Sequence, residues 1–312
     1  MRKLLFSSLI FLSTLFLSPV VDAAEISSTM DVNNIADQLF FVSVRLVCMS
    51  TGADGKPKEN IGTGFLVSYK WAENKEGLFL VTNKHVLLGV DKVRFFFTKS
   101  DGKNPILGST LSIDITDMRS GWFGHPDDKI DVAIIPVSQV INAALKKNLP
   151  IFFRSFSKDF VPTSEQVKEL YAIEDVMFVG YPIAIYDKVN FLPIVRRGIT
   201  ATPFSVDYEG LPQFLIDASV FPGSSGSPVF IMNQGAYSTK NGNYPGPRFL
   251  FLGMISKGYG YVDSKEFSDI SPVAGNNQLV GLGSVIKSTT IFETIEGFLK
   301  ITGEIKQTEP AK

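Results

Sequence analysis

The most informative stretch of the chain reads Phe221-Pro222-Gly223-Ser224-Ser225-Gly226-Ser227-Pro228-Val229-Phe230. Small residues surround Ser225, and a strand-like apolar run follows them. Glycines on both sides allow backbone conformations that turn consecutive N–H groups into one concavity. Such a concavity can hold a developing oxyanion. The same pattern also suits an ordinary turn that enters a strand, so a nucleophilic role for Ser225 needs partners elsewhere in the chain.

The chain offers only two histidines as a base for this serine, His85 and His125. Both precede Ser225, whereas α/β-hydrolases use a G-x-S-x-G elbow and place their histidine after the serine. Neither histidine lies in an H-E-x-x-H helix, so we predict no metal and no cofactor. His85 closes a strand-like run in a polar turn, while His125 stands in a polar loop. We therefore interpret His85 as the base and His125 as a solvent-exposed loop residue.

A carboxylate for the same site stands at Asp131, directly before the apolar run Val132-Ala133-Ile134-Ile135. If it is buried there, it needs a hydrogen-bonding partner. An imidazole N–H would supply that partner and would fix the tautomer of the histidine. Asp131 alone is better explained as the exposed start of a strand. Together with His85 and Ser225, it gives the chain order His, Asp, Ser.

Short apolar and β-branched runs recur along the chain, six in each half, with a helical connector between the two sets. This distribution favours antiparallel barrels over an α/β sheet, in which helices alternate with strands. We predict an all-β fold of two six-stranded antiparallel β-barrels with a C-terminal helix, which a capping box at Thr290 and Glu293 would begin. The predicted strands are 40–50, 61–70, 78–87, 93–98, 111–115, 131–137, 175–182, 195–202, 214–218, 227–232, 249–256 and 279–287.

The beginning of the chain resembles a secretory signal peptide. Arg2 and Lys3 precede an apolar stretch, and small residues lead up to a cleavage position before Ala24. No later segment reaches the ~18 apolar residues of a membrane span. We expect an exported protein, periplasmic or secreted, with no stable membrane insertion after signal cleavage. Cys48, the only cysteine, lies in an apolar run and is predicted to be a buried, inert thiol.

The strand pattern and the signal together predict the domain organisation. The formal net charge of −1 gives no reason to expect nucleic acid as a partner, and nothing predicts an oligomeric state. The predicted segments are a signal peptide at 1–23, an N-terminal segment at 24–37, a first barrel at 38–150, a connector at 151–174, a second barrel with the C-terminal helix at 175–302, and a tail at 303–312.

Four motifs follow one another along the chain: Gly62-Thr63-Gly64-Phe65-Leu66-Val67, Val81-Thr82-Asn83-Lys84-His85-Val86, Asp131-Val132-Ala133-Ile134 and Gly223-Ser224-Ser225-Gly226-Ser227-Pro228. In this order they resemble the chymotrypsin-like (trypsin-fold) serine peptidases. The last motif is most similar to the bacterial branch that includes glutamyl endopeptidases and HtrA-type proteases. The resemblance covers about residues 38–300 and implies an active site in the cleft between two barrels.

This resemblance implies a serine-type endopeptidase that acts on proteins or peptides through an acyl-enzyme intermediate. His85 would be the base, Asp131 would stabilise its imidazolium, and Ser225 would be the nucleophile. The N–H groups of Gly223 and Ser225 would form the oxyanion hole. A different class of function stays open, namely a catalytically silent trypsin-fold protein that binds a peptide or partner in the same cleft.

The resemblance also places the substrate-binding residues. Ser219, six residues before the nucleophile, would line the floor of the primary specificity pocket, and Ser256 and Gly258 would form its wall. A neutral Ser219 predicts small or apolar side chains at the cleaved position. The chain departs from the family at Ser224, where animal digestive relatives carry the Asp that binds a newly cut N-terminus, so we expect no such switch. It also has Asn83 and Lys84 where many relatives have two alanines.

Overall fold

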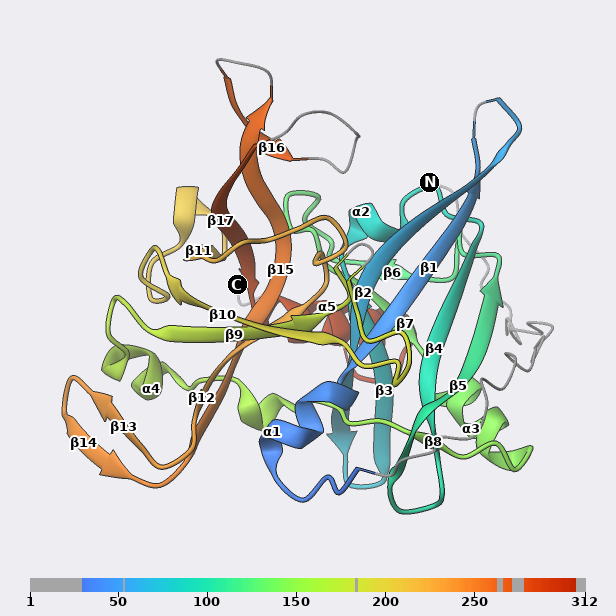
Figure 1. Cartoon of the computed structure of the whole chain (residues 1–312), viewed down its shortest axis with the longest axis horizontal. Helices are drawn as coiled ribbons and strands as arrows, with labels where there is room; N and C mark the ends of the chain where they lie inside the picture. The colour runs from blue at the N-terminus through green and yellow to red at the C-terminus, as the bar shows by residue number, and fades with distance from the viewer. Residues whose placement is uncertain (1–29, 53, 183–184, 263–265, 271–277, 307–312) are drawn as a thin grey trace.

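The computed structural model of the chain describes residues 30–52, 54–182, 185–262, 266–270 and 278–306. The predicted signal peptide and most of the predicted tail lie outside these residues. Figure 1 shows two β-units side by side, the first in blue and green and the second in yellow and orange. None of the described helices is long and apolar enough to cross a membrane.

The first unit is an antiparallel sheet of eight strands that runs in the order β5-β4-β1-β2-β3-β7-β6, with β8 paired to β4. Its central strands carry long runs of buried apolar side chains, as expected for strands that are covered on both faces. The strands are β1 (Ser43–Thr51), β2 (Pro57–Ala72), β3 (Lys75–Thr82), β4 (Lys92–Ser100), β5 (Pro105–Thr116), β6 (Phe123–Gly124), β7 (Ala133–Pro136) and β8 (Ile151–Phe152).

The second unit closes into a barrel of six strands, because β12 pairs with both β9 and β15. The order around the barrel is β12-β9-β10-β11-β17-β15, and β16 extends the sheet beyond β15. A separate hairpin is formed by β13 (Ala236–Thr239) and β14 (Gly242–Pro245). The other strands are β9 (Asp175–Gly180), β10 (Ile194–Thr200), β11 (Gln213–Asp217), β12 (Pro228–Asn233), β15 (Arg248–Val262), β16 (Glu266–Ile270) and β17 (Gln278–Lys287).

The helices are short except for the last one. They are α1 (Ile35–Gln38), α2 (Lys84–Leu87), α3 (Ser138–Lys146), α4 (Ser164–Glu169) and α5 (Ser288–Ile301), with 3₁₀ turns η1 (Leu39–Phe41), η2 (Lys158–Phe160) and η3 (Tyr208–Gly210). The capping box predicted at Thr290 is wrong, because α5 begins two residues earlier and Thr290 Oγ1 instead donates to the Lys287 carbonyl. A capping box does occur at the start of α4, between Thr163 and Gln166.

The prediction of an all-β fold with a C-terminal helix is confirmed, and each of the twelve predicted runs contains or overlaps a strand. Sequence reasoning missed β6, β8, β16 and the β13–β14 hairpin. Two of these strands are only two residues long, which is too short for any periodicity to appear. The eighth strand also extends the first sheet two residues past the predicted boundary at 150.

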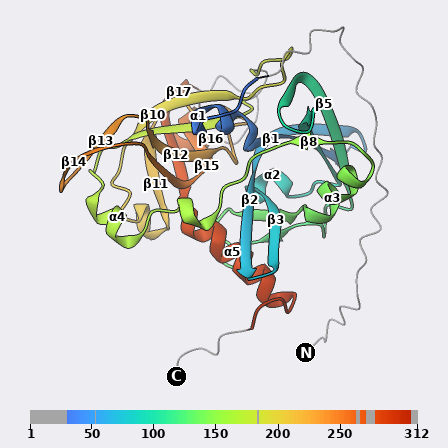
Figure 2. The same ribbon diagram turned by 90° about the horizontal axis from the view of Figure 1, so that it is seen from below.

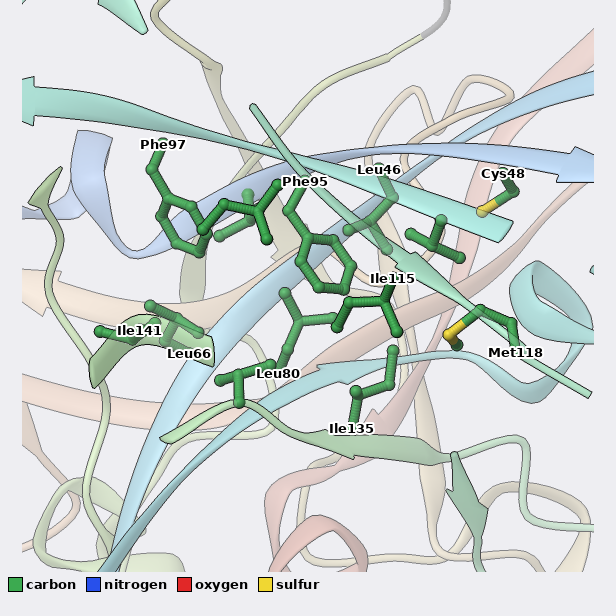
Figure 3. Close-up of a cluster of buried hydrophobic side chains, with 14 of the residues drawn as sticks. Leu46, Cys48, Leu66, Leu80, Phe95, Phe97, Ile115, Met118, Ile135 and Ile141 are labelled. Carbon is green, nitrogen blue, oxygen red and sulfur yellow. The ribbon is translucent and has the colours of Figure 1, made fainter. Parts of the chain in front are cut away.

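Three large apolar cores and one small cluster of Val32, Phe41 and Phe152 hold the described residues together. One fills the first sheet (Figure 3) and includes Cys48, whose burial raises the pKa of its thiol to about 12, in agreement with the prediction of an inert thiol. A second core fills the closed barrel. The third lies between the two sheets, where the rings of Phe156 and Phe251 stack with centroids 4.6 Å apart and Phe65 meets Phe251 edge-on.

Helix α5 belongs to both units. It contacts β6 and β7 of the first sheet and β15 and β17 of the second, and its buried residues are part of the core between the sheets. Figure 2 shows it in red, passing beneath both units. The shared core and this helix fix the relative positions of the two sheets, and the candidate residues of the site lie on both.

Candidate active site

The imidazole of His85 lies at the end of β3, in the single turn of α2. Its Nδ1 is 2.6 Å from Asp131 Oδ2, and its backbone N–H donates to Asp131 Oδ1 at 3.1 Å. A carboxylate on Nδ1 favours the tautomer that carries its proton there and leaves Nε2 free to accept one. The side chain is 42% exposed, so a substrate can reach it.

Strand pairing explains why these two residues meet. Strands β3 and β7 are antiparallel neighbours in which Thr82 faces Ala133, so the residues just beyond them, His85 and Asp131, emerge at the same edge of the sheet. The two residues are 46 positions apart in the sequence, and the pairing of the strands brings their side chains together in space. Ser256 Oγ, from the second barrel, donates to Asp131 Oδ2 at 3.0 Å. The carboxylate therefore accepts three hydrogen bonds and is well satisfied.

Ser225 lies in a turn that only glycine permits at two positions. Gly223 and Gly226 have φ angles of +87° and +85°, in the left-handed region. A Cβ on Gly226 would overlap the carbonyl oxygen of Thr63. The glycines that sequence analysis singled out on either side of Ser225 are therefore required by conformation and, for Gly226, by space.

Backbone groups from both sheets anchor this turn. Thr63 N donates to the Ser225 carbonyl at 3.1 Å, and Thr63 Oγ1 donates to the Gly223 carbonyl at 2.9 Å. From the other side, Gly226 N donates to the Ile255 carbonyl at 2.9 Å. Sequence analysis missed this role of Thr63, although the glycines that flank it signal a backbone that another chain segment approaches closely.

Two backbone donors beside the serine are free. Within the part of the chain that the structure describes, neither Gly223 N nor Ser225 N donates a hydrogen bond to another protein group, whereas Ser224 N, Gly226 N and Ser227 N all do. Unpaired N–H groups on alternate residues of one tight turn are the arrangement that an oxyanion hole requires.

The hydroxyl of Ser225 donates to the Ser256 carbonyl at 3.1 Å, and among the described residues no hydrogen bond joins it to the His85 imidazole. Ser256 occupies an irregularity in the pairing of β15 with β17, where the register shifts between Ile255 and Lys257. Irregularities of this kind redirect backbone groups and are common beside active sites. Through its carbonyl and its hydroxyl, Ser256 contacts both Ser225 and Asp131.

Val220 stands beside two of the predicted specificity residues, Ser219 and Gly258. Ser219 is exposed, whereas its neighbour Val220 is only 4% exposed. The atoms nearest to the side-chain position of Gly258 belong to Val220, and the same is true for Gly283 on the paired strand β17. Val220 therefore packs over the paired glycines Gly258 and Gly283, just beyond Ser256.

The expectation that His125 is solvent-exposed is wrong. Its side chain is 9% exposed, its Nδ1 accepts the Asp127 N–H at 3.1 Å, and its Nε2 is 3.7 Å from a carboxylate oxygen of Glu293 on α5. Helix α5 covers the loop that holds His125, and its position was not visible from the local sequence. Among the described residues, no group of three or more His, Cys, Asp or Glu could hold a metal ion.

Comparison with known proteins gives one family and two structural neighbours. The model of the trypsin-like peptidase domain matches residues 62–236. The chain is similar to the structure of an HtrA-type protease, AlgW, with a tripeptide (17% identity, TM-score 0.44), covering 86% of this chain but only 63% of that one. It is also similar to the HL collagenase structure (13% identity, TM-score 0.45), covering 86% and 96% of the two chains. A search of curated proteins gives no match.

Proposed function

The chain belongs to the trypsin-like peptidase family, and from this premise we propose that it is an exported serine endopeptidase. Ser225 is the nucleophile, His85 the general base and Asp131 the carboxylate that orients the base. The substrates are proteins or peptides. The mechanism needs no cofactor, because every proton transfer and every stabilising contact comes from these residues and from backbone N–H groups.

One observation carries the proposal: an unbroken series of contacts links the three residues. His85 Nδ1 meets the Asp131 carboxylate at 2.6 Å, that carboxylate accepts Ser256 Oγ at 3.0 Å, and the Ser256 carbonyl accepts Ser225 Oγ at 3.1 Å. The contacts bring into one site the base, the acid and the hydroxyl that were named from sequence order. Free N–H groups at Gly223 and Ser225 lie in the same turn as that hydroxyl.

The chemistry follows from this geometry. Rotation about the Cα–Cβ bond of Ser225 takes its hydroxyl off the Ser256 carbonyl and onto His85 Nε2. His85 removes the proton as Ser225 Oγ attacks the scissile carbonyl, and Asp131 stabilises the imidazolium that forms. The N–H groups of Gly223 and Ser225 bind the oxyanion. The imidazolium then protonates the leaving amine, and water hydrolyses the acyl-enzyme by the same steps.

A second candidate function is a silent trypsin-fold protein that only binds a peptide or partner. The observation that favours it is the hydrogen bond of Ser225 Oγ to the Ser256 carbonyl, which takes the hydroxyl away from the base. The proposed mechanism requires the Ser225 side chain to rotate away from this carbonyl, and chemical labelling of the serine distinguishes the two functions.

The test is covalent labelling of the purified chain, without its signal peptide, by a fluorophosphonate probe, combined with cleavage of an unstructured protein such as casein. We expect labelling of the wild type and none of Ser225→Ala. Ser205→Ala is the matched control, because Ser205 is exposed. Labelling that persists in Ser225→Ala, or an unlabelled and inactive wild type that is folded, contradicts the proposal.

The preferred residue at the cleaved bond is small or apolar. Val220 packs against Gly258 and Gly283. Gly258 lies two residues after Ser256, whose carbonyl accepts the hydrogen bond of Ser225 Oγ. A buried valine leaves little volume there and presents no charge to a substrate. A peptide-library profile dominated by Arg, Lys, Asp or Glu at the cleaved position contradicts this part of the proposal.

Export rests on the signal-like sequence at residues 1–23. We expect the mature chain to begin at Ala24 and to be active without a further cleavage, because Ser224 offers no carboxylate to a new N-terminus. Mass spectrometry of the protein recovered from periplasm and medium tests both points. Retention of residues 1–23 in the active protein, or activity that appears only after a second cut, contradicts them.

A further inference from the structure

The two residues before the base, Asn83 and Lys84, both point their polar groups at the turn that carries the acid. Asn83 is completely buried and its Nδ2 donates to the backbone carbonyl of Asp131 at 2.9 Å. Lys84 Nζ donates to the backbone carbonyl of Asp127 at 2.9 Å. The first contact holds the end of the turn at residues 127–131 and the second holds its beginning.

Lys84 is held in this contact along its whole length. Its side chain is 17% exposed, and a Cβ on Gly124 of β6 would lie 2.9 Å from Lys84 Cε. The ammonium group also lies 4.0 Å from the carboxylate of Asp128, which is fully exposed and so adds little. The main role of the ammonium is therefore to bind a carbonyl in the backbone of the turn.

The turn itself is rigid between these two points. Ile130 N donates to the Asp127 carbonyl at 3.1 Å, and Lys129 N donates to Asp127 Oδ1 at 2.9 Å. On its outer side, Asp127 N donates to the buried His125. A displacement of either anchored carbonyl therefore also displaces Asp131, whose carboxylate contacts His85.

Both anchors carry a cost in stability. Asn83 Oδ1 is buried and has no hydrogen-bond partner within the described residues, and an unpaired buried acceptor is destabilising. A lysine fixed along its length loses much of its rotamer entropy. Small apolar residues at both positions would avoid these costs. That the chain bears them at two successive positions beside His85 suggests a role in the chemistry.

We propose that Asn83 and Lys84 are positioning residues, which clamp the turn at residues 127–131 to the His85 helix and so keep the Asp131 carboxylate on Nδ1. The inference rests on the proposed function, and deepens it by naming what orients the acid. Neither residue touches a reacting atom. Each acts through Asp131, whose own contact with the imidazole is 2.6 Å long and tolerates little displacement.

The experiment compares Asn83→Ala and Lys84→Met with a control, Lys129→Met, in the mature chain. Lys129 lies in the same turn and is exposed, and it contributes its backbone N–H to the turn. For each clamp variant we expect kcat to fall on the order of tenfold to a hundredfold with little change in KM, because ground-state binding is untouched. The control is expected to match the wild type.

Two further readouts separate positioning from general loss of structure. The acidic limb of the kcat/KM profile moves to lower pH in the clamp variants, because a carboxylate held less firmly stabilises the imidazolium less. In proton NMR at low pH, the downfield resonance of the His85 Nδ1–H weakens or shifts. The thermal midpoint is measured alongside, and Lys84→Met serves as the test if Asn83→Ala fails to fold.

A clamp variant that folds and keeps both the wild-type pH profile and the wild-type Nδ1–H resonance overturns the inference. The inference is also overturned if each variant, Lys129→Met included, loses activity only in proportion to the fall in its thermal midpoint. An inactive wild type that resists the fluorophosphonate probe counts instead against the proposed function. In that case the Nδ1–H resonance of the variants still decides whether Asn83 and Lys84 hold the contact.

Discussion

The two halves of the site are built from different kinds of atoms. On the first sheet, the Asp131 side chain contacts both the imidazole and the backbone N–H of His85. In the turn around Ser225, the anchors are mainly backbone groups and glycines, together with the side-chain hydroxyl of Thr63. The first half sets where charge lies, and the second sets where backbone donors and the nucleophile lie.

This difference determines which amino-acid substitutions each half of the site tolerates. A carboxylate can be replaced by an isosteric amide without moving the backbone, so a change in the first half removes function and spares the fold. The Ser225 turn has no room for added atoms, since Gly226 faces the Thr63 carbonyl and Gly180 faces Ser227 Oγ. A change there alters backbone geometry and affects stability and function together.

The largest effect is expected from Asp131→Asn. The amide keeps the shape of the carboxylate but removes its charge and favours the wrong tautomer of His85, so kcat falls on the order of 10⁴-fold. The thermal midpoint changes little. Asp128→Asn, on an exposed side chain in the same turn, is the control and keeps wild-type kinetics. A wild-type kcat in a folded Asp131→Asn variant removes this residue from the mechanism.

Gly226→Ala tests the other half and comes next in size. The added Cβ meets the Thr63 carbonyl and the left-handed φ adds strain, so we expect a lower thermal midpoint and a loss of labelling rate on the order of 10²-fold to 10³-fold as the oxyanion donors move. Gly89→Ala is the matched control. Gly89 has a φ of +73° with nothing within 4 Å, so it carries strain without overlap.

If Gly226→Ala and Gly89→Ala lose the same stability and neither loses labelling rate, the close approach of Thr63 is irrelevant. In that case, the claimed difference between the two halves of the site disappears.

Local signals predicted much of this molecule. The glycines around Ser225 were informative because their conformational requirement is a property of the residue itself. The strand-like runs were found because apolar and β-branched composition is also local. The order His, Asp, Ser excluded one fold family before any geometry was known, and the contact between His85 and Asp131 is consistent with it.

Several features of the site that sequence reasoning missed depend on a distant segment. The His125 side chain is 9% exposed, and α5, some 170 residues later in the chain, places Glu293 3.7 Å from it. The second contact of Ser256, through its hydroxyl, needs Asp131 from the other sheet. The clamp by Asn83 is visible only when β3 and β7 are paired. No periodicity or motif in a single sequence predicts such contacts between distant residues.

Ser256→Ala examines a residue that contacts both halves of the site. It deletes the hydroxyl on Asp131 and keeps the carbonyl that holds Ser225, so only the acid loses a partner. A hydrogen bond to a charged group is worth about 1.5–3 kcal/mol, which predicts a fall in kcat of about tenfold to a hundredfold. Ser284→Ala, on the neighbouring strand with a bond to Gln213, controls for a lost buried hydroxyl. Equal losses in both variants contradict a specific link through Ser256.

The smallest expected change concerns which substrate is cleaved. Val220→Ala removes two methyl groups between Gly258 and Gly283, and the ratio of kcat/KM for a peptide cleaved after Leu to one cleaved after Ala rises by about tenfold. The rate on the Ala peptide stays within about threefold, because the nucleophile and its donors do not move.

Val229→Ala is the control, since Val229 is fully buried in the same barrel core. It should lose comparable stability and keep the wild-type ratio. If both variants shift the ratio equally, general loosening of the barrel explains the effect and Val220 does not shape the pocket.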